Sequence, residues 1–242
     1  MNTSRWRKLT YRQATADDAD RIMAFCRDKP CGTEIHTSVK LNGEKTEIGC
    51  LWTGTDGAGL LRLVVYDNGS YVTYLTRRSG FVAKPPKEDG FDRFAAPKRK
   101  ARLCRMVYRG GTPSFPEGVT ALRGTALLEM YKAVRETDAL NDRTERRYVA
   151  RARAVNAGLA ETFGIYEDGK IASTAGICAK NERYALIGDV YTVYQYRFQG
   201  YAAKLVNACV AAAREQGLTP VLYCEKGMRK FYRKLGFVEL AR

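Results

Sequence analysis

The sequence feature that most constrains this fold is a strand that leads through a glycine-containing turn into a strongly patterned helix. The segment YALIGDVYTV, residues 184–193, is rich in β-branched and aromatic residues and predicts a strand. A helix is predicted from about Gly200 to Gln216, because small and apolar residues recur there at helical spacing: Ala202, Leu205, Val206, Cys209, Val210 and Ala213. Such a junction directs backbone N–H groups and the positive end of a helix dipole at one point, which suits an anion.

The spacing Arg197-x-x-Gly200-x-Ala202 adds chemistry to this junction. Gly200 lets a phosphate approach the backbone without a Cβ in the way, and Ala202 keeps the surface small. Arg197 can add a charge-assisted hydrogen bond. The motif therefore predicts a pyrophosphate site, although an ordinary strand-to-helix turn explains the same residues when the motif is considered alone.

The second half of the chain predicts a mixed α/β unit. Leu127, Met130, Tyr131 and Val134 share one helical face, and a very basic helix follows over 142–155. Three strand segments, a helix, a strand, a helix and a short final strand complete the order ααβββαβαβ: TFGIYE, KIASTAGICA, YALIGDVYTV, the helix at 200–216, PVLYC, MRKFYRKLG and the terminal strand. This order can fold as a unit of its own.

The first half predicts a strand and a helix followed by an antiparallel meander. In YRQATADDADRIMAFC, Thr15 can cap a helix together with Asp18 three residues later. Short β-rich runs separated by turn residues then extend over 45–76. Residues 84–102 are rich in proline and charge and predict a connection, so a domain boundary is placed near residue 110.

Two motifs carry a resemblance to a known family. The turn around Arg197 and Gly200 resembles the R/Q-x-x-G-x-G/A acyl-CoA signature of the GNAT superfamily of N-acetyltransferases. The segment FYRKLGF, residues 231–237, resembles the second signature of that superfamily. The resemblance implies an α/β (α+β mixed sheet) GNAT fold over 111–242. Residues 1–110 would form a degenerate GNAT-like unit, as in two-unit bacterial proteins of this type.

The resemblance also assigns roles to particular residues. Acetyl-CoA would be the acyl-donor cosubstrate, and the backbone of Val190 and Thr192 would pair with its pantetheine arm. The pyrophosphate would be cradled by Arg197 and by the N–H groups of four consecutive residues: Gln199, Gly200, Tyr201 and Ala202. Tyr232 would protonate the departing thiolate, a task that suits a phenol. Packing of Tyr232 at its helix face is the alternative interpretation.

An amine nucleophile must lose a proton, so a carboxylate or a carboxylate-bound water is expected near the pantetheine strand. Asp189 is the nearest candidate in sequence, with Glu182 behind it, and a solvated or turn-stabilising role is the alternative for Asp189. The function expected from these residues is transfer of acetyl to a primary amine of an unidentified acceptor, by direct attack in a ternary complex. A non-catalytic CoA-binding protein is the second hypothesis.

Composition bears on which other classes of protein, cellular locations and site types this chain can have. The net charge of +15 also allows a nucleic-acid-binding regulatory protein, although no zinc-finger, helix-turn-helix or RNP-like signature accompanies the charge. No apolar run approaches the length of a membrane span and the N-terminus has no secretory pattern, so a cytoplasmic protein is expected. Seven cysteines without a C-x-x-C pair predict reduced core residues and no metal site. With His36 as the single histidine, a His-based triad has little support.

Overall fold

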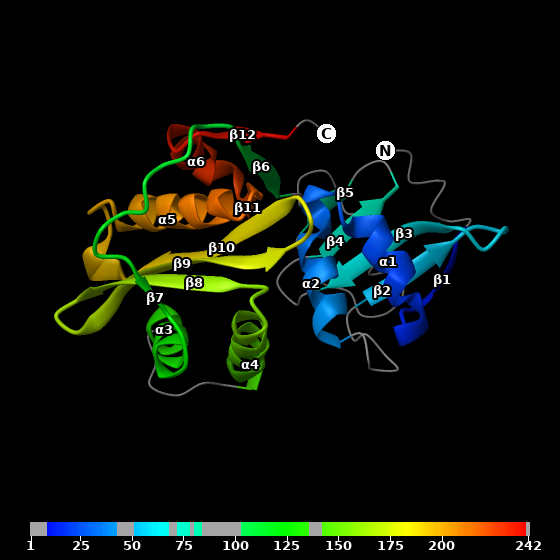
Figure 1. Ribbon diagram of the computed structural model, residues 1–242, viewed down its shortest axis with the longest axis horizontal. Helices are drawn as coiled ribbons and strands as arrows, with labels where there is room; N and C mark the ends of the chain where they lie inside the picture. The colour runs from blue at the N-terminus through cyan, green and yellow to red at the C-terminus, as the bar shows by residue number, and fades with distance from the viewer. Residues whose placement is uncertain are drawn as a thin grey trace.

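The computed structural model describes residues 9–42, 51–67, 72–77, 80–83, 103–135 and 142–240. These residues form two β-sheets that lie side by side, each with its own helices (Figure 1). The connection predicted over 84–102 falls outside the described residues. The mixed α/β class expected from the sequence is confirmed.

The N-terminal unit is a five-stranded antiparallel sheet in the order β1-β2-β3-β4-β5, so the predicted meander is confirmed. Its strands are β1 (Thr10–Gln13), β2 (Leu51–Thr55), β3 (Leu61–Asp67), β4 (Val72–Thr76) and β5 (Gly80–Ala83). Helix α1 (Ala19–Cys26) follows a short 3-10 turn in which the Thr15 N–H donates to the Asp18 carboxylate. Helix α2 (Thr33–Asn42), which the sequence analysis missed, packs with α1 on Leu51, Val64 and Leu75.

The C-terminal unit is a seven-stranded sheet in the order β12-β6-β11-β10-β9-β8-β7. Its strands are β6 (Cys104–Tyr108), β7 (Thr120–Ala121), β8 (Glu161–Glu167), β9 (Lys170–Lys180), β10 (Tyr184–Thr192), β11 (Thr219–Cys224) and β12 (Phe237–Glu239). Helices α3 (Thr125–Arg135) and α4 (Asp142–Asn156) cover one face, whereas α5 (Tyr201–Glu215) and α6 (Arg229–Lys234) cover the other (Figure 1). The predicted order ααβββαβαβ is confirmed from α3 onward.

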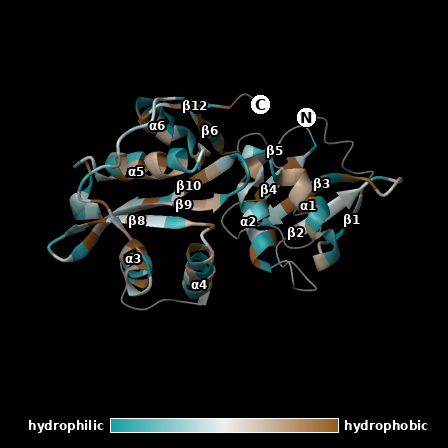
Figure 2. Cartoon of the chain, in the orientation of Figure 1, coloured by the Kyte–Doolittle hydropathy of each residue, from teal (hydrophilic) through white to brown (hydrophobic). Residues whose placement is uncertain are grey.

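Helix α5 is amphipathic, with hydrophobic and hydrophilic residues alternating along it (Figure 2). Its apolar side chains join the largest core cluster together with residues of β8, β9, β10 and β11. The periodicity that predicted this helix is therefore the periodicity of its buried face. The packing fixes the N-terminal end of α5 against the sheet, which matters for the site described below.

Strand β6 has a place in the sheet that its position in the sequence does not suggest. It lies between β11 and β12 and pairs antiparallel with both, with Val107 opposite Val221 on one side and Val238 on the other. The division of the chain at residue 110 stays a prediction. However, β6 lies before residue 110 and is a strand of the C-terminal sheet, so the C-terminal unit also includes residues from before the predicted boundary.

Met106→Ala is expected to lower the free energy of unfolding by about 2–5 kcal/mol, because a fully buried side chain would leave a cavity. Met106 is at the middle of β6, is 0% exposed and belongs to the largest core cluster. Denaturant unfolding followed by circular dichroism measures the change. Val149→Ala, on the exposed side of α4, is the control and should stay within about 0.5 kcal/mol of the parent. Equal stability of the two variants would contradict a core role for β6.

Candidate cofactor and acceptor site

Strands β10 and β11 separate in the middle of the C-terminal sheet. They pair in parallel from Tyr184 opposite Thr219 to Ile187 opposite Leu222. Beyond that point β10 continues to Thr192 along β9, whereas β11 continues along β6 to Cys224. Among the described residues, no strand pairs with the edge of β10 that carries Val190 and Thr192. An extended ligand can use that edge as an additional strand would.

A β-bulge marks the same stretch of β10. Gly188 lies opposite Gly176 and Tyr191 opposite Thr174, so two residues of β10, Asp189 and Val190, face one residue of β9. Asp189 has a positive φ of 51°, which is uncommon for a residue other than glycine. The bulge twists β10 away from its regular course where it leaves β11.

The turn after β10 ends at Gly200, the N-cap of α5. Gly200 has a φ of 83°, and apart from its two chain neighbours no described residue has a heavy atom within 4 Å of the position that a Cβ would occupy. The left-handed backbone at this position therefore favours glycine, and the space beside its Cα is open. The first helical bond joins the Lys204 N–H to the Gly200 carbonyl, at 3.0 Å, so the N–H groups of Tyr201 and Ala202 precede it. They point out of the N-terminus with the positive end of the dipole.

Arg197 lies at this turn with its side chain exposed. Its Nε donates to the Thr192 carbonyl at 3.1 Å, and its guanidinium lies 5.3 Å from the centre of the Tyr194 ring. These contacts hold the charge close to the end of β10 and to the start of α5. Gln199 and Gly200 are exposed beside it. The structure therefore brings together all the residues predicted for the pyrophosphate, and their roles stay predictions.

Tyr232 lies on α6 and is 7% exposed. Its ring makes edge contacts with Phe231 and Phe237, at centroid distances of 5.0 and 6.0 Å. Burial raises the pKa of the Tyr232 phenol to about 12, with smaller contributions from Cys224 and Cys209. Cys224 ends β11 just beyond the strand separation, so the phenol lies near this part of the sheet and stays protonated at neutral pH.

Asp189 forms an ion pair across the sheet face. Its Oδ2 lies 2.7 Å from Nη2 of Arg151 on α4, and the Arg151 Nη1 donates to the Ile177 carbonyl at 3.2 Å. The Asp189 side chain is 42% exposed and that of Arg151 is 11% exposed. The pair fixes the bulge of β10 to α4. Glu182, the second carboxylate considered from sequence, lies exposed in the β9–β10 turn and does not line the cavity described next.

A cavity of about 580 Å³ begins where β10 and β11 separate and extends between the two units. Ile187, Gly188 and Asp189 of β10 form one part of its wall, and Tyr223 and Cys224 of β11 form another. Helices of both units complete it with polar, charged and apolar side chains: Glu34, Thr37, Ser38, Leu41, Asn42, Tyr131, Arg147, Ala150, Arg151 and Ala154. The cavity therefore adjoins the free edge of β10.

Most of the residues that line the cavity were not predicted from the sequence to belong to a functional site. Arg147 and Arg151 lie in the very basic helix predicted over 142–155, and their spacing of four places both at the cavity. On α2, Ile35 and Val39 are also four apart and buried, a helical signal that could have revealed this wall. Glu34 had no signal, because nothing local indicates that α2 faces the second unit.

The cysteines, the acidic residues and His36 decide whether disulfide, metal or histidine chemistry is also present. The six described cysteines are all free. Cys178 is half-buried, and the other five are buried: Cys26, Cys31, Cys104, Cys209 and Cys224. The described ranges contain no cluster of three or more His, Cys, Asp or Glu residues that could hold a metal. His36 is buried on α2, and burial together with Lys40 lowers its pKa. No helix in the described part is both long and apolar enough to cross a membrane.

Part of this chain is similar to known proteins. A search of curated proteins finds no match. Residues 126–237 match the model of the acetyltransferase (GNAT) family. Many solved structures are similar, and three of them serve as examples. A GNAT-family protein from Novosphingobium aromaticivorans is 26% identical, with a TM-score of 0.47, and the match covers 57% of this chain and 59% of that one.

A GNAT-family acetyltransferase from Colwellia psychrerythraea is 15% identical over 57% of this chain and 52% of that chain, with a TM-score of 0.46. A predicted acetyltransferase from Clostridium acetobutylicum, crystallised with acetyl-CoA, is 19% identical over 51% of this chain and 92% of that chain, with a TM-score of 0.42. The chain spans less than two thirds of the length of the Novosphingobium and Colwellia proteins.

The residues matched by the family model run from α3 to the start of β12. They contain the strand separation, the bulge, the Gly200 turn, helix α5 and Tyr232. The part of the chain that carries the candidate site, residues 126–237, is therefore the part that matches the model of the acetyltransferase (GNAT) family.

Proposed function

We propose that this protein transfers an acetyl group from acetyl-CoA to a primary amine, by direct attack within a ternary complex. One observation carries the proposal. The free edge of β10 starts where β10 leaves β11 and adjoins a cavity of about 580 Å³ at Gly188 and Asp189, and the chain continues from the end of that edge through the Gly200 turn into α5. A donor bound along the edge would present its thioester to the cavity, and an acceptor would enter from the other side.

The donor side is supplied by backbone groups and by Arg197. The backbone of Val190 and Thr192 would pair with the pantetheine arm, which carries amide groups suited to strand-like hydrogen bonds. The N–H groups from Gln199 to Ala202 would receive the pyrophosphate, because a helix N-terminus favours negative charge. Arg197 would add a charge-assisted bond at the same point.

Two residues are proposed to handle protons. The Tyr232 phenol, protonated because burial raises its pKa to about 12, would give its proton to the departing thiolate. The acceptor amine would lose its proton to Asp189 or to a water held by it. The ion pair between Asp189 and Arg151 holds that carboxylate in place at the cavity wall.

Direct attack is favoured over an acyl-cysteine intermediate. Two cysteines line the cavity, Cys178 and Cys224, and burial raises the pKa of Cys178 to about 12 and that of Cys224 to about 11. The thiolate is the nucleophilic form of cysteine, so both side chains are almost entirely unreactive at neutral pH. Direct attack of the amine on the thioester carbonyl does not need a cysteine thiolate.

Calorimetric titration with acetyl-CoA, followed by a coupled assay of CoA thiol release with primary amines, tests the proposal. Binding together with amine-dependent release supports N-acetyl transfer. Binding without release for any amine favours a non-catalytic CoA-binding protein. If acetyl-CoA does not bind, the proposal fails, and salt-sensitive binding to RNA or DNA becomes the property to measure because of the charge of +15.

A further inference from the structure

Asn181 joins the two units through a side-chain amide whose nitrogen and oxygen each make two hydrogen bonds. It lies in the turn between β9 and β10 and is 5% exposed. Its Nδ2 donates to the Cys26 carbonyl at 3.0 Å and to the Lys29 carbonyl at 2.9 Å, both in the N-terminal unit. Its Oδ1 accepts from the N–H groups of Arg183 and Tyr184, at 3.1 and 2.8 Å, within its own turn.

This arrangement assigns different tasks to the two ends of one amide. The oxygen holds the hairpin that starts β10, while the nitrogen satisfies carbonyls where α1 ends and the chain turns toward α2. A buried amide with all these partners is costly to disturb, because each lost bond leaves a polar group unsatisfied. The sequence separation between Asn181 and Cys26 is 155 residues, so the contact serves the tertiary structure alone.

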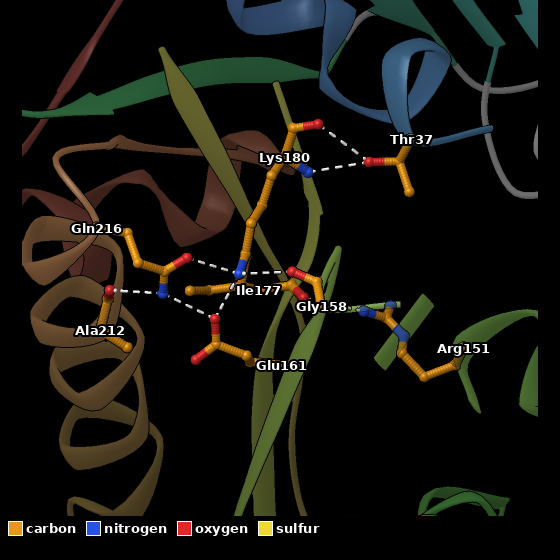
Figure 3. A network of polar contacts seen from close by, with 8 residues as sticks. All are labelled: Thr37, Arg151, Gly158, Glu161, Ile177, Lys180, Ala212 and Gln216. Carbon is orange, nitrogen blue, oxygen red and sulfur yellow. Dashed lines mark hydrogen bonds and ion pairs between the residues drawn. The ribbon is translucent and has the colours of Figure 1, made fainter. Parts of the chain in front are cut away.

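A second bridge reinforces the first. The Thr37 hydroxyl on α2 accepts from the Lys180 N–H at 3.0 Å and donates to the Lys180 carbonyl at 3.1 Å (Figure 3). The Lys180 Nζ reaches in the other direction, to Glu161 and to Gln216 Oε1, which lies 2.7 Å away (Figure 3). Arg153 on α4 also donates to the Leu41 carbonyl of α2, at 3.0 Å.

These bonds fix α2 at the cavity. Glu34, Thr37, Ser38, Leu41 and Asn42 of α2 all line it, whereas Asn181 itself does not. The two bonds of Asn181 Nδ2 end on the segment that leads from α1 into α2, so their effect on a ligand in the cavity passes through the position of α2. The volume of about 580 Å³ lies within the range of roughly 300–1,000 Å³ for small-molecule pockets and is too small for a folded partner.

We propose that Asn181 is a positioning residue of the acceptor site, which holds helix α2 of the N-terminal unit as a wall of the cavity where a small amine approaches the donor. This inference rests on the proposed acetyl transfer. It gives the N-terminal unit a defined task, which is to shape the acceptor pocket, and it names the acceptor class as a primary amine carried by a small molecule.

Asn181→Asp is the sharpest test, because the aspartate keeps both acceptor bonds inside the turn, loses the two donor bonds to the N-terminal unit and turns a carboxylate oxygen toward the carbonyls of Cys26 and Lys29. With putrescine, L-lysine and glucosamine 6-phosphate as amine probes, the KM for the amine that reacts is expected to rise about tenfold or more, as two hydrogen bonds are lost. The change in kcat should be smaller, and the Kd for acetyl-CoA should stay within about twofold, since no donor-side group is moved.

Gln216→Ala is the matched control. Gln216 belongs to the same network, but its side-chain hydrogen bonds in the described part of the chain go to Lys180, Glu161 and Ala212 of the C-terminal unit, so the KM for the amine should not change (Figure 3). Hydrogen exchange supplies a second readout: amides of α2 should exchange faster in Asn181→Asp, and amides of α5 should not. If Asn181→Asp does not fold, Thr37→Val removes the second bridge, and exchange of the α2 amides is then the readout because Thr37 itself lines the cavity.

A folded Asn181→Asp protein with parental KM and parental exchange in α2 would overturn the proposal. It would also be overturned if the parent releases CoA with larger primary amines but with none of the small amine probes, because the cavity would then not be a small-amine site. Absence of acetyl-CoA binding by the parent is a different result, since it removes the proposed function itself.

Discussion

Gly200→Glu is expected to weaken acetyl-CoA binding by at least about 100-fold while the protein stays folded, because each lost charge-assisted hydrogen bond costs roughly 1.5–3 kcal/mol. The glutamate places a negative charge where the pyrophosphate is proposed to lie. Open space surrounds the Cβ position, so no core contact is lost. The left-handed backbone, with a φ of 83°, strains the new residue by about 1–2 kcal/mol. A carboxylate at a helix N-terminus offsets part of that strain.

The chain offers a matched control for this substitution. Gly59 has a φ of 70°, open space around its Cβ position and a place in the β2–β3 turn of the N-terminal unit. Gly59→Glu therefore adds the same charge and a similar strain away from the proposed site, and it should bind acetyl-CoA as the parent does. Calorimetric titration and thermal unfolding measure both variants. Parental affinity in folded Gly200→Glu would place the pyrophosphate elsewhere.

Tyr232→Phe is expected to lower kcat by about 10²–10⁴-fold with little change in the Kd for acetyl-CoA, because the variant removes only a proposed general acid. Phenylalanine fills nearly the same volume between Phe231 and Phe237, so the packing is retained. An acid must be protonated to act. Since the folded pKa of about 12 lies above the ordinary value of 10.0, this group should cause no fall in parental kcat between neutral pH and pH values near 10.

Tyr108→Phe separates catalysis from packing. Tyr108 is 6% exposed, belongs to the same core cluster and contacts the Phe237 ring at 5.1 Å, and its hydroxyl donates to the Gly111 carbonyl at 2.6 Å. Loss of that hydroxyl should reduce stability and leave kcat nearly unchanged. Stopped assays of CoA release across the pH range compare the variants. If Tyr232→Phe behaves like Tyr108→Phe, the phenol of Tyr232 serves packing alone.

Local signals in the sequence account for the donor side of the site. The turn from Arg197 to Gly200 and the start of α5 were predictable, because a left-handed glycine and a helix with one apolar face are properties of neighbouring residues. The element order of the C-terminal unit has the same origin. The free edge of β10 could be expected only through the resemblance to a family, since strand separation depends on what each strand pairs with.

The acceptor side depends on contacts that no short window of sequence contains. Asp189 could be identified as a carboxylate near the strand, but its ion pair with Arg151 joins residues 38 apart. The aspartate is turned to the cavity by a bulge whose register is set by β9. In the same way, β6 enters the C-terminal sheet because β11 and β12 each leave an edge that a strand from outside the matched domain can pair with.

The sequence by itself determined a mixed α/β unit with a glycine turn at the start of a helix, because periodicity, a glycine and a helix start are encoded within a few residues of one another. The tertiary structure alone decided that α2 forms a wall of the cavity, that β6 lies between β11 and β12, and that Asn181 joins the two units. The physical reason is that these features are hydrogen bonds and buried surfaces between segments far apart in the chain, and their partners are chosen only when the whole core packs.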